Sequence, residues 1–135
     1  MQHNRIHISL TFSFRGETFT PTVELDLDAC MRKFDGVPNL YDVLGEQIGI
    51  DEFRHEYDVM AMEEINFDHV EGFVAEYIVD GMLDAERFAA RWHEAQAIET
   101  LQAIAEKHLG INNLAEHPET KSALLAAYHH GRKHR

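Results

Sequence analysis

The residue types best suited to metal chemistry gather in the acidic middle of the chain. Carboxylates and imidazoles are common ligands of divalent ions. If residues 52–64 form a helix, acids seven positions apart in it lie close to one face. Four residues are therefore the candidate metal ligands: Glu56, Glu63, Glu64 and His69. A small enzyme or metal-binding protein that uses carboxylates and histidines of residues 51–76 is one function that the sequence allows.

No familiar catalytic or cofactor-binding pattern accompanies these residues. Di-metal helix bundles carry a Glu-x-x-His pair on each of two helices, and this sequence does not have two such pairs. A phosphate-binding glycine loop, a nucleophile elbow, a CxxC pair and a His-Glu-x-x-His motif are also missing from it. We therefore predict no catalytic residue and no cofactor, and a non-enzymatic role is favoured over an enzymatic one.

Charge is concentrated in the same region. The chain has a formal net charge of −12, and residues 35–86 hold fifteen acids against a single base, Arg54. Phosphate groups are bound by Lys and Arg, so we expect this region to bind neither a nucleic-acid backbone nor an anionic membrane surface. The acids either keep the protein in solution or form a surface for a basic partner. An acidic mimic of nucleic acid is a further possibility of that second kind.

A β-hairpin is predicted over the first 28 residues. Apolar and polar residues alternate from Ile6 to Phe14 and again from Phe19 to Leu27, which gives each strand one apolar face. A two-residue turn at Gly16 and Glu17 puts both apolar sets on the same face. This register places Phe14 opposite Phe19 and Ile6 opposite Leu27.

Pro21 predicts that the second strand of the hairpin is a sheet edge, because proline has no N–H to donate to a further strand. The outer edge of residues 5–14 then needs a cover. If residues 52–64 are helical, we expect the same strand of a second subunit to provide it. If residues 52–64 are a strand instead, they are the natural cover. A homodimer is therefore favoured, and the first strand is one candidate for its seam. The alternative is a monomer whose open edge is protected by strand twist, by Arg5 and His7, or by the C-terminal segment.

The apolar spacing after the hairpin changes from two to about 3.6 residues, as in amphipathic helices. Residues 29–37 are predicted to be a connector. Helices are expected at residues 38–48, 52–64, 69–79, 85–109 and 118–130. For residues 52–64 the helix is preferred over the strand because of their composition and the preceding cap residue Asp51. Trp92 is expected to be buried between the 85–109 helix and the hairpin.

The sequence thus predicts an α+β fold in which an N-terminal antiparallel β-hairpin, residues 5–28, packs on four to five α-helices. We expect a single domain over residues 1–135, with the hairpin in 1–28, a helical part in 38–130 and a basic tail in 131–135. One cysteine, Cys30, and the lack of a long apolar run fit a cytoplasmic protein. The favoured function is a protein-interaction or structural module that acts as a homodimer.

Overall fold

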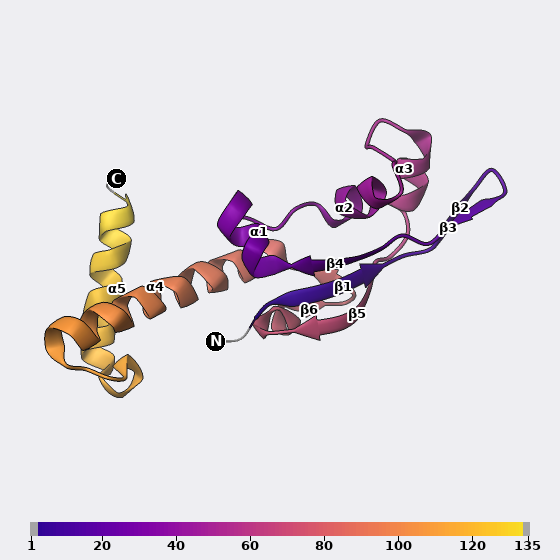
Figure 1. Ribbon diagram of the computed structural model, residues 1–135. Coiled ribbons are helices and arrows are strands. Elements are labelled where there is room, and N and C mark those ends of the chain that lie inside the picture. Colours follow the sequence, from indigo (N-terminus) through magenta and orange to yellow (C-terminus); the bar gives the residue numbers. More distant parts are fainter. Residues whose placement is uncertain (1–2, 134–135) are drawn as a thin grey trace. The chain divides into compact units, whose positions relative to one another are not determined.

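A computed structural model describes residues 3–133 and has the predicted α+β class (Figure 1). The chain divides into two compact units, Met1–Ala89 and Ala90–Arg135. The first unit contains the strands, and the second is helical. No helix in the described part of the chain has the length and apolar character needed to cross a membrane.

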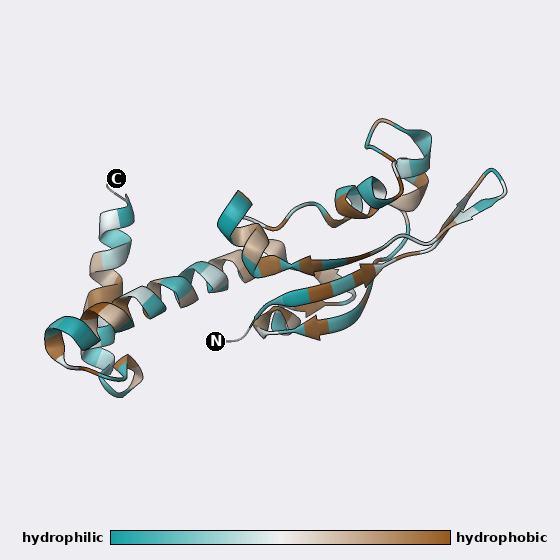
Figure 2. Ribbon diagram, viewed as in Figure 1, coloured by the Kyte–Doolittle hydropathy of each residue, from teal (hydrophilic) through white to brown (hydrophobic). Residues whose placement is uncertain are grey.

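The centre of the first unit is an antiparallel sheet in the order β4-β1-β5. Its strands are β1 (Arg5–Ser9), β4 (Thr22–Asp26) and β5 (Asn66–Glu71). The two isoleucines of the central strand, Ile6 and Ile8, are fully buried. Apolar and polar residues alternate along these strands in Figure 2. One face of the sheet therefore belongs to the core, as the sequence pattern predicts.

The hairpin is confirmed, but its predicted register is wrong by two residues. The outer part pairs β2 (Phe12–Phe14) with β3 (Glu17–Phe19), and Phe14 lies opposite Glu17. In the inner part, Ile6 lies opposite Leu25. The turn residues are Arg15 and Gly16, with φ values of 52° and 78°. Two successive positive φ values are typical of a type I′ turn, which matches the twist of a hairpin. A shift of two residues keeps every side chain on its predicted face.

The predicted helix over residues 69–79 is also wrong. The segment instead continues from β5 into the 3₁₀ turn η1 (Phe73–Tyr77) and a small hairpin of β6 (Ile78–Val79) and β7 (Met82–Leu83). Gly72 interrupts it with a φ of 88°. The turn of the small hairpin is Asp80-Gly81, also with two positive φ values. Asp-Gly is a strong hairpin signal, and its preference outweighs the helical spacing of the apolar residues.

The outer edge of β1, for which the sequence predicts a partner subunit, is covered by a strand of the same chain. β5 pairs with the whole of β1, with an irregular step between His7 and Ile8. The first strand therefore lies in the middle of the sheet, and its prediction as a dimer seam is wrong. The prediction from Pro21 is confirmed, since β4 is an edge strand. The unpaired groups of β1 are satisfied within the chain, which removes the argument that required a partner there.

Three short helices follow β4: α1 (Leu27–Phe34), α2 (Leu40–Gln47) and α3 (His55–Met60). α2 was predicted, whereas α1 replaces most of the predicted connector. α1 forms because the carboxylate of Asp26 accepts a hydrogen bond from the N–H of Ala29 at 3.0 Å and so caps the first turn. α3 is only six residues long, so the predicted helix over 52–64 is confirmed in its centre alone.

The long helix α4 (Ala85–Leu109) and the final helix α5 (Pro118–Lys133) are confirmed. In the second unit, the side chain of Gln102 holds the connection between them, which contains the 3₁₀ turn η2 (Leu114–Glu116). Its amide donates to the carbonyl of Ile111 at 3.0 Å and accepts from the N–H of Leu114 at 2.6 Å. The core of this unit is apolar and contains Leu101, Ala105, Leu114, Leu124, Leu125 and Tyr128.

Two further predictions concern the second unit. Trp92 is buried, as predicted, and its packing against the hairpin stays a prediction. The helix α5 continues past Gly131 into the predicted basic tail, whose last two residues lie outside the described part of the chain.

Tyr57 gives the N-terminal unit a testable dependence on alkaline pH. Its hydroxyl donates to the carboxylate of Asp42 at 2.6 Å and so links α3 to α2. Burial, and then this hydrogen bond, raise the pKa of Tyr57 to about 12. Since the folded state favours the neutral phenol, its stabilising effect is complete below about pH 10 and is lost as the pH rises through the folded-state pKa.

An ultraviolet titration of the tyrosines is expected to show a late ionisation near pH 12. Tyr57→Phe should remove that step and leave the remaining steps in place. Ionisation of every tyrosine at the ordinary value of about 10 would contradict the packing of α3 on α2.

Candidate functional site

The N-terminal unit has an apolar groove with a volume of about 520 Å³. Three separate segments line it: residues 37–41 at the start of α2, residues 62–65 before β5, and residues 80–83 in the small hairpin. Phe67 of β5 and the small hairpin of β6 and β7 contribute to this lining, so the groove depends on strands that were not predicted from the sequence. Two methionines line it and are largely exposed, Met62 at 85% and Met82 at 73%.

The rim of this groove is acidic. Glu63, Glu64 and Asp80 line it, and no Lys or Arg is found among the described residues that do so. The hydroxyl of Tyr41 donates to the backbone carbonyl of Glu63 at 2.6 Å, which ties the rim to α2. Burial, together with the charges of Glu64 and Glu63, raises the pKa of Tyr41. The groove thus combines an apolar surface with a negative potential.

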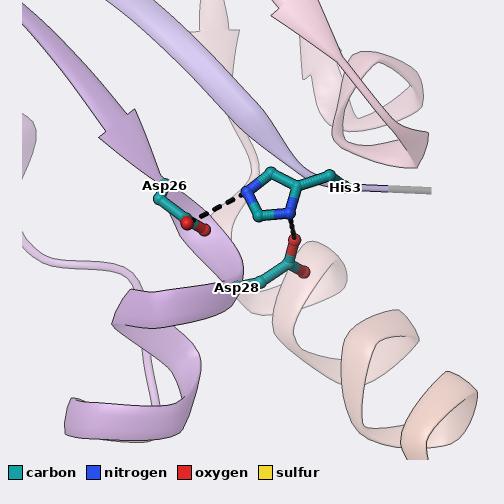
Figure 3. Close-up of side chains that lie close together, drawn as sticks. All are labelled: His3, Asp26 and Asp28. Atoms are coloured by element: carbon teal, nitrogen blue, oxygen red, sulfur yellow. Dashed lines mark ion pairs between the residues drawn. The ribbon is translucent and has the colours of Figure 1, made fainter. Parts of the chain in front are cut away.

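A second group of polar side chains lies at the start of the sheet (Figure 3). The imidazole of His3 sits between two carboxylates. Its Nε2 lies 3.0 Å from Asp26 Oδ2, and its Nδ1 lies 3.5 Å from Asp28 Oδ2. Among residues 3–133, these three side chains form the set whose ligand atoms all lie within 4.8 Å of one another. We call them the His3 cluster.

Both carboxylates of the His3 cluster are held by backbone groups. Asp28 is buried and accepts from the N–H of Asn4 at 2.7 Å and from its side-chain amide at 3.1 Å. Asp26 is the N-cap of α1 and accepts from Ala29. Burial acts to raise the pKa of Asp26, but the Ala29 hydrogen bond and the neighbouring His3 outweigh it, and the pKa is lowered. Asp26 is thereby kept ionised.

A lowered pKa makes Asp26 a source of stability at neutral pH. Its contribution is present above the unfolded-state pKa of about 3.9 and is lost as the pH falls through the lower folded-state value. The loss of this contribution lowers the stability of the folded protein at acid pH. Asn is as good an N-cap as Asp, so Asp26→Asn is expected to retain α1 while removing the charge.

The four ligands predicted from the sequence are divided among three places. Glu56 pairs with Arg54, with an N–O distance of 2.7 Å. Glu63 and Glu64 lie together on the groove rim. His69 faces His7 across β5 and β1, with ring centroids 6.0 Å apart. The fold therefore brings only Glu63 and Glu64 of the four to one site.

The His3 cluster was not predicted from the sequence. The incorrect register had placed Asp26 opposite His7, whereas the structure places Asp26 opposite Arg5 and His7 opposite Glu24. When the turn is placed at Arg15 and Gly16, the pairing of β1 with β4 brings His3, two residues before β1, close to the end of β4. The position of this turn is therefore the sequence feature from which the His3 cluster could have been predicted.

Comparison with known proteins gives no match, either to a family model, to a curated protein or to a solved structure.

Proposed function

We propose that this protein is a non-enzymatic binding module whose groove receives a segment of a partner protein. The segment carries one or two large apolar side chains flanked by Lys or Arg. The observation that carries this proposal is the groove itself, which has exposed Met62 and Met82 beside three acids.

Methionine side chains supply the apolar part of the interaction. They are flexible and polarisable, so they adapt to different partner shapes. Burial of a methionine side chain contributes about 1.5–3 kcal/mol, so the two methionines supply part of the binding free energy, and the apolar side chains of the partner segment supply the rest. Exposed apolar patches with polar surroundings are typical of protein-interaction sites. In this groove the patch is framed by Glu63, Glu64 and Asp80.

The acidic rim supplies selectivity. Negative charges around an apolar patch attract a basic segment and repel an acidic one, which affects the association rate more than the final affinity. The surrounding residues 35–86 have fifteen acids against one base, so the attraction extends beyond the rim. A mimic of nucleic acid would bind through charge alone and would release its partner in high salt. The apolar surface predicts binding that weakens in salt and does not vanish.

The test uses two synthetic amphipathic peptides of equal apolar content, one with Lys and one with Glu at every charged position. The Lys peptide is expected to bind and to shift the NMR signals of residues lining the groove. The double variant Met62→Ser with Met82→Ser should weaken this binding at least tenfold. Phe53→Ser is the matched control, since Phe53 is also highly exposed but does not line the groove. Equal binding of both peptides, or unchanged binding by the double variant, would refute the proposal.

We further propose that the module forms a homodimer, through a surface other than β1. The described part of the chain exposes several large apolar side chains, which favours self-association. They are Phe34, Phe53, Met62, Val79, Met82, Ile104 and Leu109. Light scattering at micromolar concentration is expected to give roughly twice the chain mass of 15.6 kDa. A mass of one chain would rule out the dimer and leave the groove proposal standing.

A further inference from the structure

We propose that the His3 cluster binds one divalent transition-metal ion, with Zn²⁺ as the reference ion, through one imidazole nitrogen of His3 and one oxygen each from Asp26 and Asp28. The three ligand atoms lie within 4.8 Å of one another. This site is separate from the groove and does not depend on the proposed binding function.

The three side chains of the His3 cluster are close enough for small side-chain rotations to bring one atom from each to a single ion, since these atoms all lie within 4.8 Å of one another. With metal–ligand bonds of about 2.0–2.2 Å, adjacent ligand atoms are about 3.0–3.5 Å apart. His3 lies 3.0 Å from the Asp26 oxygen and 3.5 Å from the Asp28 oxygen. The two contacts use different nitrogens (Figure 3), so the ring must turn to direct one nitrogen at the ion. The side chain of His3 is 43% exposed, which leaves room for that turn.

The two negative charges of the His3 cluster favour a cation between the carboxylates of Asp26 and Asp28. In the described structure, the imidazole of His3 fills the space between the two carboxylates (Figure 3). The side chain of Asp28 is only 8% exposed and accepts two hydrogen bonds from Asn4, which hold its carboxylate in place. A divalent cation satisfies both carboxylates at once. Mixed imidazole and carboxylate donors suit Zn²⁺ and its transition-metal neighbours, whereas Ca²⁺ and Mg²⁺ take oxygen ligands.

The ligands are positioned before any ion arrives. Asn4 holds Asp28 through two hydrogen bonds, and Ala29 holds the other oxygen of Asp26. Asn4 is itself fixed, because its side-chain oxygen accepts from the N–H of Val74 at 3.0 Å. Partners of this kind orient the ligands of metal sites and typically change affinity 10–100-fold. Three protein ligands leave coordination positions for water or for a further ligand.

The experiment is a calorimetric titration of the untagged, chelator-treated full chain with Zn²⁺ at pH 7.5. One ion per chain is expected, with NMR shifts at the His3 ring. His3→Gln and Asp26→Asn should each weaken binding at least tenfold, and Asn at position 26 preserves the cap of α1. His108→Gln is the control, because His108 is an exposed histidine of α4 outside the cluster.

A second control separates this site from the facing pair His7 and His69. His69→Gln is expected to leave the affinity unchanged. The proposal is overturned if no stoichiometric binding occurs, or if binding survives both His3→Gln and Asp26→Asn. It is also overturned if His69→Gln, rather than His3→Gln, removes the ion. Circular dichroism of each variant confirms that the fold is retained before the titration is interpreted.

Discussion

Phe88→Ala is expected to lower the free energy of unfolding by about 3–5 kcal/mol. The side chain of Phe88 is 0% exposed. Its ring centroid lies 5.5 Å from that of Phe73 and 6.5 Å from that of Tyr77. Removing the ring takes away both the buried apolar surface and these aromatic contacts, and it leaves a cavity in the core.

Urea unfolding followed by circular dichroism measures this loss. Phe53→Ala is the matched control, because the side chain of Phe53 is 87% exposed. The control should change stability by no more than about 0.5 kcal/mol, as surface substitutions usually do. Equal effects of the two substitutions would mean that Phe88 is not in the core of the first unit.

Gly72→Ala is expected to cost about 2–5 kcal/mol, through backbone strain and overpacking together. Gly72 has φ 88° and ψ −177°, a region that is almost exclusive to glycine. A Cβ atom there would lie 2.5 Å from Asn4 Oδ1 and 2.7 Å from the carbonyl oxygen of His3. Both neighbours belong to the segment that carries the His3 cluster. The same substitution is therefore expected to weaken Zn²⁺ binding.

Gly36→Ala is the control for this substitution. No atom lies within 4 Å of its added Cβ, and its φ is not in the left-handed region. It should leave both the urea midpoint and the Zn²⁺ affinity close to those of the parent chain. A neutral effect of Gly72→Ala would show that β5 ends in a looser turn than the structure gives.

Local patterns in the sequence determined the α+β class, the faces of the hairpin strands and the long helices. Period-two alternation around Ile6 and Ile8 determines which side chains are buried, and the two-residue error in the register leaves these faces unchanged. The helix over 85–109 is marked by its cap residue Asp84 and by Gly110 after its end, and Pro118 marks the start of the last helix. The edge position of β4 also followed from one residue, Pro21, because a missing N–H acts locally.

Tertiary structure decided the strand β5 and the groove, whereas the turns at Arg15-Gly16 and Asp80-Gly81 were local signals. The apolar spacing of residues 69–79 fits a helix, but the unpaired edge of β1 offers hydrogen bonds that only a strand can complete, and positive φ at Gly72 and Gly81 ends any helix there. That pairing brings the distant segments of the groove together and places the N–H of Val74 against the side-chain oxygen of Asn4. Contacts over such separations depend on which edge is left open after the hairpin forms, and no short window of sequence contains that information.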